Sequence, residues 1–202
     1  MPPLPDPKGV FLNIPYDEEF SSLYVAYIVG LIQLGLAPHI TSEIPGGDRR
    51  LDKILKLIQS CRYSIHDLSR VEVSVAPSAV PRFNIPLELG MTITWAKTHP
   101  SRHSWFVWES EPYRLQRSAS DLNGTDPNIH NGAPERVLSG LRSALGRDHP
   151  PPMPQMLKVY NLVGTALDSI FLRNGTRSPY DRSVFMDLCS LSVSLAPPRP
   201  TV

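Results

Sequence analysis

The chain has 202 residues, of which 41% are hydrophobic and 19% are charged, and its formal net charge at pH 7 is +1. This length predicts one domain, or one domain with an appendage, that buries a substantial core. The balanced charge is typical of a soluble protein. It argues against a nucleic-acid-binding protein and against other partners that are recognised through strong charge.

The two cysteines, Cys61 and Cys189, lie far apart in segments expected to be helical, and their spacing fits no metal site. We therefore expect buried thiols in a reducing cytosol. The first seven residues are rich in proline and lack the basic and apolar regions of a signal peptide, and no apolar run is long enough to span a bilayer. These observations predict a cytoplasmic protein with no membrane anchor and no bound metal.

Short apolar runs alternate with amphipathic helical patterns over most of the chain. Strands are expected at 9–13, 38–43, 63–68 and 104–109, and helices at 17–35, 50–61, 87–97, 135–145, 156–172 and from 178 to about 195. Alternation at this spacing predicts a parallel sheet with helices on both faces. We expect a three-layer α/β fold with a flavodoxin-like strand order and a C-terminal α-helical appendage.

Proline is frequent, with 22 residues, and four of them fall within positions 150–154. Because such a block fits neither a helix interior nor a central strand, it predicts a linker. The expected organisation is an α/β domain over 8–149, the linker over 150–154 and a helix pair over 155–196. The helix pair could cover the main domain or form a dimer interface, and the pattern leaves both alternatives open.

Glu88 is the first candidate for chemistry. Pro86 sets the entry of its helix, and a carboxylate one turn inside is expected to stay ionised beside the backbone amides and the positive helix end. Such a carboxylate can attack an anomeric carbon or stabilise an oxocarbenium-like transition state. Glutamates are also common in the first turn of helices that have no chemical role, so both interpretations stand.

Polar residues follow the third expected strand. Asp67, together with Asn13, could accept hydrogen bonds from a ribose diol, and His66 is a further candidate for binding the substrate. Alternatively, Asp67 caps the next segment while His66 bonds a backbone carbonyl. Arg70 and Arg82 flank this place and could meet phosphate, because a guanidinium matches two phosphate oxygens at once. Surface ion pairs are the alternative for both arginines.

The end of the first expected strand faces the same edge of the sheet and carries Asn13, Tyr16 and Asp17. Asp17 is also placed to cap the first helix, which is expected to stop near Gly35. Tyr16 could stack on a base.

Two residues before the helix of Glu88 complete the expected binding set. Phe83 is a second candidate for stacking on a base, and Asn84 is expected to contact the same ligand.

A polar, turn-rich segment covers residues 120–130, after the fourth strand. It could close over the site as a lid, with Asp121, Asp126 or His130 reaching inward, or it could be a plain surface loop. The chain has no phosphate-binding glycine fingerprint, no zinc-type spacing and no Gly-x-Ser-x-Gly elbow. These absences argue against an ordinary dehydrogenase, NTPase, metallohydrolase or α/β-hydrolase.

Four segments together carry a resemblance: residues 11–17, 63–70, 81–90 and 120–126. They resemble a bacterial family within the Toll/interleukin-receptor (TIR)-like and nucleoside 2-deoxyribosyltransferase-like group. The resemblance covers about residues 8–146, and the middle two motifs are specific. In that group a glutamate on the helix after the third strand acts on the anomeric carbon of a ribosyl or deoxyribosyl group. Glu88, in its Glu-Leu-Gly setting, matches that glutamate.

The resemblance implies a nucleotide substrate, either NAD with release of nicotinamide or a related nucleotide or nucleoside, with NAD as substrate and no separate cofactor. It also implies homo-oligomeric assembly and a place in anti-phage defence. The loop after the first strand departs from the transferase pattern except for an aromatic and an acid, and the C-terminal helix pair has no counterpart.

The leading hypothesis is therefore N-glycosidic bond cleavage or transfer, with Glu88 and Asp67 as the catalytic candidates. A non-catalytic nucleotide sensor or assembly module that uses the same pocket is the alternative. A scaffold whose polar strand ends are purely structural is a third interpretation.

Overall fold

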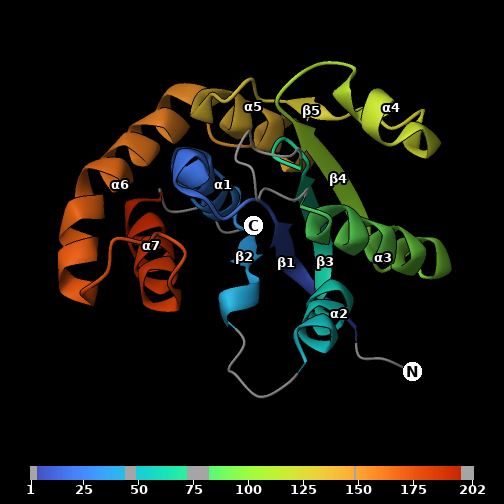
Figure 1. Ribbon diagram of the computed structural model, residues 1–202. Coiled ribbons are helices and arrows are strands. Elements are labelled where there is room, and N and C mark those ends of the chain that lie inside the picture. Colours follow the sequence, from blue (N-terminus) through green and yellow to red (C-terminus); the bar gives the residue numbers. More distant parts are fainter. Residues whose placement is uncertain (1–3, 44–48, 72–81, 148, 197–202) are drawn as a thin grey trace, which may run out of the picture. The chain divides into compact units, whose positions relative to one another are not determined.

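The computed structural model describes residues 4–43, 49–71, 82–147 and 149–196 (Figure 1). The chain forms two compact units, one from residues 1–15 and 38–132 and the other from residues 16–37 and 133–202. We call them the sheet unit and the helical unit. This division cuts the chain at other places than the predicted linker, and the predicted domain boundaries stay a prediction because compactness does not test independent folding.

The sheet contains five strands among the described residues: β1 (Asp6–Asn13), β2 (Ala37–His39), β3 (Cys61–Asp67), β4 (Ser104–Glu109) and β5 (Asn128–Ile129). Their order is β2-β1-β3-β4-β5, and the ladders β1–β3, β3–β4 and β4–β5 are parallel. The predicted α/β class with a parallel sheet is confirmed. The order is compatible with a flavodoxin-like fold, in which ligands bind at the carboxyl ends of the strands.

The strand register gathers the polar strand ends at one edge of the sheet. Asn13 of β1 pairs with His66 of β3, and Asp67 pairs with Trp108 of β4. Glu109, the last residue of β4, pairs with Ile129 of β5. The side chains that end β1, β3 and β4 therefore share the carboxyl edge, as the sequence pattern predicts.

Three helices of the sheet unit follow its strands: α2 (Arg50–Ser60), α3 (Asn84–Thr98) and α4 (Arg114–Ser118). The apolar stripe of α2 packs on Phe11 of β1, and Met91 and Trp95 of α3 pack against the same cluster. A second cluster joins α3 to β4, and its members include Leu89 of α3 and Val107 of β4. These contacts hold α2 and α3 on the face of the sheet to which Phe11 points.

Several element boundaries differ from the predictions. The second strand ends at His39 rather than Glu43, and Thr41–Glu43 form a 3-10 turn. Cys61 begins β3 rather than ending a helix. The helix α3 begins at Asn84, three residues before the predicted start, because Pro86 falls among the first four residues, whose N–H groups have no intrahelical acceptor. Proline at this position is therefore compatible with the helix.

Residues 110–132, which follow β4 and include the predicted polar segment 120–130, contain α4 and β5 in addition to turns. The strand β5 has two residues and α4 has five, so neither is long enough to show an apolar period. The sequence pattern therefore had no signal for them.

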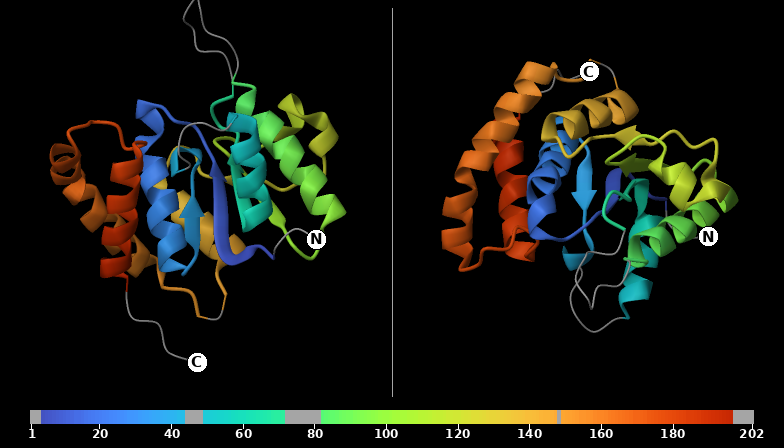
Figure 2. Two further views of the ribbon diagram at one scale, coloured as in Figure 1. Left: turned by 90° about the horizontal axis from the view of Figure 1, so that it is seen from below. Right: turned by 45° about the horizontal axis from the view of Figure 1, so that its top comes forward.

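The helical unit consists of α1 (Ser21–Gln33), α5 (Pro134–Leu145), α6 (Met153–Asn174) and α7 (Arg182–Leu195) (Figure 2). Within this unit α1 contacts all three other helices. Its residues from Leu23 to Gln33 are all buried, as expected for a helix that is apolar on every side. A Cβ at Gly30 would lie 2.7 Å from Leu141 Cδ1, so α1 and α5 cross closely there and a larger residue would make the Leu141 side chain shift.

The predicted end of the helix near Gly35 is confirmed, whereas α1 begins at Ser21, four residues later than predicted. The Asp17 carboxylate accepts a hydrogen bond of 3.2 Å from the Phe20 N–H and caps a 3-10 turn that leads into the helix. Gly35 follows the helix with φ of +71°, a conformation that glycine adopts without strain.

The two C-terminal helices start at other residues than predicted. The helix α6 begins at Met153, inside the predicted linker, and α7 begins after Asp181 rather than Ser178. The Ser178 hydroxyl accepts a hydrogen bond from the Tyr180 N–H and so stabilises a turn instead. None of the helices in the described residues has the length and apolar composition that crossing a bilayer requires.

Candidate functional site

Two groups of buried polar side chains lie in the sheet unit. The β1–β3 group contains Asn13, Ser64, His66 and His103, and the β3–β5 group contains Asp67, Glu109, Arg114 and His130. His66 and Asp67 are consecutive strand residues, so their side chains point to opposite faces of the sheet. The predicted candidates at the end of β3 therefore belong to two separate networks.

Asn13 joins the end of β1 to the first turn of α3. Its amide nitrogen donates to the carbonyl oxygen of Ile85 at 3.0 Å and lies 2.8 Å from Nδ1 of His66. An amide nitrogen is a donor and not an acceptor, so Nδ1 of His66 is unprotonated. Asn13 thereby fixes the tautomer of His66 and holds the start of α3 against the sheet.

The hydrogen bonds continue along β3 from His66. With its proton on Nε2, His66 donates to the Ser64 hydroxyl at 3.0 Å, and that hydroxyl donates to Nε2 of His103 at 3.0 Å. Nδ1 of His103 donates to the carbonyl oxygen of Cys61 at 2.9 Å. Every group in this chain has a partner when both imidazoles are neutral.

The protonation of the two histidines agrees with this order. Burial, together with the smaller effect of the neighbouring His103, lowers the pKa of His66 to about 3. Burial also lowers the pKa of His103, against the opposing effect of its bond to the Cys61 carbonyl. At neutral pH both rings are therefore uncharged, and the group is a structural network.

Glu88 lies in the second turn of α3, on the face that also carries Ile85 and Thr92. Its side chain is buried, with 5% of the residue exposed. Among the described residues its carboxyl group has no hydrogen-bond or ion-pair partner. Burial raises its pKa to about 7, and the positive charge of Arg50 acts in the opposite direction.

The predicted protonation state of Glu88 needs correction. Because α3 begins at Asn84, Glu88 is the fifth helical residue and lies beyond the first four N–H groups that stabilise an anion. Desolvation therefore outweighs the helix end. The carboxyl group is divided between its two protonation states near neutral pH, rather than held ionised.

Arg50 is the charged neighbour of Glu88 that the sequence analysis missed. It is the first residue of α2, and its charge acts on the Glu88 carboxyl. The available signal was topological, because each helix of a parallel α/β unit starts at the carboxyl edge of the sheet. Arg50 is exposed and can meet an anionic ligand near Glu88.

In the β3–β5 group, both oxygens of the Asp67 carboxylate face protein groups. One oxygen accepts the Ser69 N–H at 3.0 Å, and the other lies 3.3 Å from Nε2 of His130. Nδ1 of His130 accepts the Gly132 N–H at 2.9 Å, so Nε2 carries a proton, and this buried nitrogen faces Asp67 without a hydrogen bond among the described residues. Asp67 and His130 thus tie the end of β3 to the loop after β5.

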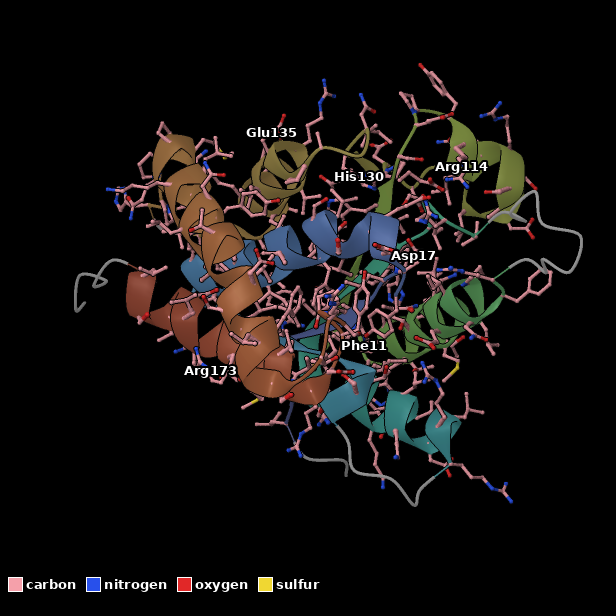
Figure 3. All side chains as sticks on the ribbon, turned by 60° about the vertical axis from the view of Figure 1, so that its left-hand side comes forward. Phe11, Asp17, Arg114, His130, Glu135 and Arg173 are labelled. Carbon is pink, nitrogen blue, oxygen red and sulfur yellow. The ribbon has the colours of Figure 1, made fainter. Side chains whose placement is uncertain are left out.

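Arg114 fastens the end of β4 to the turn after β3 (Figure 3). Its Nη1 donates to the Ser69 carbonyl at 2.6 Å, to Oε2 of Glu109 at 3.0 Å and to the Ser110 hydroxyl at 3.2 Å. Burial raises the pKa of Glu109, and the charge of Arg114 opposes that shift. Oε1 of Glu109 is buried and has no hydrogen-bond partner among the described residues.

The residues predicted to contact substrate before α3 are accessible. The Arg82 N–H donates to the Val71 carbonyl at 3.1 Å. This hydrogen bond brings Arg82 close to Val71 and therefore to Arg70, the residue before it. Phe83 is 70% exposed, and Asn84 is also exposed. The predicted motif 81–90 begins at Pro81, which lies outside the described residues.

Tyr16 and Asp17 belong to the helical unit. The ring of Tyr16 lies 5.0 Å from that of Tyr180, whose hydroxyl donates to the Asp17 carbonyl at 2.6 Å. The Tyr180 ring also packs on Tyr24 at 4.7 Å. This cluster accounts for Tyr16 without a ligand, and stacking of Tyr16 on a base stays a prediction.

The three predicted lid residues have different surroundings. Asp121 and Asp126 are exposed, whereas His130 is buried against Asp67. His130 therefore reaches the strand ends as a structural partner.

Sequence reasoning missed five residues of these networks: Arg50, Ser64, His103, Glu109 and Arg114. A signal existed for Ser64, which alternates with His66 along β3, and for Glu109, which ends β4 as Asp67 ends β3.

In the described part of the chain, no three His, Cys, Asp or Glu side chains are arranged to hold a metal ion. Comparison with known family models and with curated proteins finds no match to this chain.

Proposed function

We propose that the protein cleaves or transfers the N-glycosidic bond of a nucleotide, with NAD as the first substrate class and nicotinamide as the leaving base. In this proposal the sheet unit is a member of the TIR-like and deoxyribosyltransferase-like group, with its three-layer flavodoxin-like architecture. The observation that carries the proposal is the buried Glu88 carboxyl, which has no partner among the described residues and a pKa of about 7. A buried group of this kind is a candidate for acid, base or nucleophilic chemistry.

The reaction assigns Glu88 to the anomeric carbon. The bond between C1′ and the pyridinium nitrogen breaks, and its electron pair leaves with nicotinamide as a neutral base. The Glu88 carboxylate attacks C1′ or stabilises the oxocarbenium-like transition state. Water then adds hydroxide to C1′ and releases a proton, or an acceptor base takes the place of water in a transfer.

The surface around the start of α3 provides groups that suit a nucleotide. Asn84 and Glu88 are four residues apart and therefore share a face of the helix. Asn84 is exposed and Glu88, one turn later, is buried. Arg50 and Arg82 are exposed cations for the phosphates, and Phe83 is an exposed ring for the base. Asn13 is a positioning residue, because its amide holds α3 at Ile85.

The test is incubation of purified protein with NAD and a panel of nucleosides and nucleotides, with free base measured by chromatography. Wild type is expected to release nicotinamide at a rate that rises as pH increases through about 7, because the ionised form of Glu88 is required. Glu88→Gln should lower the rate by about a thousandfold or more. Glu111→Gln, at an exposed glutamate, is the matched control and should keep full activity.

The other outcomes separate the rival functions. No turnover by either protein, together with a higher melting temperature in the presence of one nucleotide, would establish a sensor instead, because ligands that bind the native state stabilise it. Absence of both effects would contradict nucleotide binding. Homo-oligomeric assembly is part of the same proposal, and light scattering with and without nucleotide measures it.

A further inference from the structure

Exposed apolar side chains gather on α2 and on the start of α3, which pack against each other within the sheet unit (Figure 1). The largest are Leu51 with 48% exposed, Leu55 with 37%, Phe83 with 70% and Leu87 with 58%. Single exposed apolar residues are normal, but several on adjoining helices are typical of an interaction surface.

An open groove of about 600 Å³ runs between these helices. Leu55 lines it from α2, and Leu87, Gly90, Met91 and Trp95 line it from α3. Met91 and Trp95 also pack against the core cluster of the sheet unit, so the groove has a firm floor. A Cβ at Gly90 would meet no heavy atom within 4 Å, so the groove is open above that residue.

The two helices that form the groove are basic at their exposed positions. Over residues 49–60 and 82–98 the exposed cations are Arg49, Arg50, Lys56, Arg82 and Lys97, and the one exposed acid in these ranges is Asp52. The whole chain has a net charge of +1, so this surface concentrates positive charge. An apolar groove on helices with these exposed cations, which we call the basic rim, favours an occupant that is apolar on one face and acidic beside it.

We propose that the α2–α3 groove binds an amphipathic α-helix of a partner protein, with an apolar face and acidic flanks. A helix presents apolar side chains at i, i+3, i+4 and i+7, which is the spacing that a groove between two helices accepts. The floor is apolar, which disfavours nucleic acid, and its walls are helices, which offer no free strand edge for an extended peptide. Small side chains at Gly90 and Thr94 let a helix approach closely.

This inference does not rest on the proposed function, although the groove adjoins Glu88. Leu87 lines the groove and Glu88 is the next residue, on the buried face of the same helical turn. Arg50, on the basic rim, is also the cation that acts on the Glu88 carboxyl. A bound acidic helix would therefore compete with Glu88 for Arg50.

The experiment selects binders from a displayed library of helical peptides of about 16 residues on the full-length protein, and measures the affinity of the best peptide by titration calorimetry. The selected peptides should share the helical apolar spacing and carry Asp or Glu beside it. Leu87→Glu and Gly90→Trp should each weaken the best peptide by about tenfold or more, and added salt should weaken it further.

Two control variants should keep the affinity of wild type. Leu172→Glu places the same charge on another exposed leucine, on α6, where 86% of the residue is exposed. Gly90→Ala adds one methyl group where there is space for it. Thermal unfolding of each variant establishes that a loss of binding is not a loss of fold.

Three results would overturn the proposal. Selected peptides with no helical apolar spacing, or with basic flanks, would exclude an acidic amphipathic helix as the partner. Full affinity in both Leu87→Glu and Gly90→Trp would exclude the α2–α3 groove as the binding site. If wild type alone self-associates in sedimentation and Leu87→Glu makes it monomeric, the occupant is a second copy of this chain instead.

Discussion

Asp67 and Glu88 are both buried acids of the sheet unit, and their surroundings differ in kind. The Asp67 carboxylate accepts the Ser69 N–H on one oxygen and faces His130 on the other. The Glu88 carboxyl has no such partner among the described residues, and burial raises its pKa to about 7. Partners offset the desolvation of a buried carboxylate, whereas a carboxyl without them takes up a proton more readily.

This difference distinguishes an acid that holds the fold from an acid that is available for chemistry. By sequence pattern both residues were catalytic candidates, because each stands near the carboxyl edge of the sheet. The Ser69 hydrogen bond and the contact with His130 link Asp67 to the turn after β3 and to the loop after β5, so Asp67 has a structural role. For this reason our proposal takes Glu88, and not Asp67, as the reacting group. Substitution of each acid tests the difference between them.

The largest expected effect is that of Asp67→Ala. The substitution leaves the Ser69 N–H without its acceptor and removes the buried carboxylate that faces the His130 ring, so the free energy of unfolding should fall by about 3 to 5 kcal/mol. Urea denaturation measures the loss. Asp121→Ala, at an exposed acid, should leave stability unchanged, and a loss for Asp67→Ala as small as that of this control would break the comparison.

Glu88→Gln should change stability in the opposite direction and in a pH-dependent way. The raised pKa means that native protein binds the Glu88 proton more tightly than unfolded protein does, so wild type loses stability as pH rises from about 4.5 to about 7. Glutamine has no proton to lose. Above the folded pKa the variant should be more stable than wild type by on the order of 3 kcal/mol, and below pH 4.5 the two should agree.

Thermal unfolding of both proteins across this pH range measures the effect. Parallel profiles, with no gain for the variant above pH 7, would mean that the Glu88 carboxyl is stabilised in its charged form. The contrast with Asp67 would then disappear.

Asn13→Ala should have the smallest effect of the three. It removes two hydrogen bonds and leaves the buried Nδ1 of His66 without its donor, at a cost of about 2 kcal/mol. Amide hydrogen exchange should speed up in the first turn of α3 more than at its end. Asn123→Ala, at an exposed asparagine, is the control, and equal exchange along α3 would argue against the positioning role of Asn13.

The part of the fold that depends on local pattern could be predicted from the sequence. Apolar runs and helical periods place β1, β3 and β4 and most helices, and their alternation implies the parallel sheet. The short β5 and α4 left no such pattern. The predicted start of α3 was three residues too late, because the helix was expected to begin after Pro86 and proline is in fact tolerated in a first turn.

The site was predictable as a list of residue types at strand ends and not as a set of contacts. Asn13 and Ile85 are separated by 72 residues, and the proximity of Arg50 to Glu88 depends on how α2 and α3 pack. Likewise, no local signal shows that Asp67 faces His130. Partners that are distant in the chain decide which buried acid is paired, and so the protonation of Glu88 could not be foreseen.

The bond between Asn13 and Ile85 also bears on how β1 finds its place during folding. A slip of one residue between β1 and β3 would turn every β1 side chain to the opposite face of the sheet. An apolar strand such as Gly9–Leu12 discriminates weakly against this slip, since both of its faces are apolar. Asn13 supplies the discrimination, because only the native register brings its amide to Nδ1 of His66 and to the start of α3.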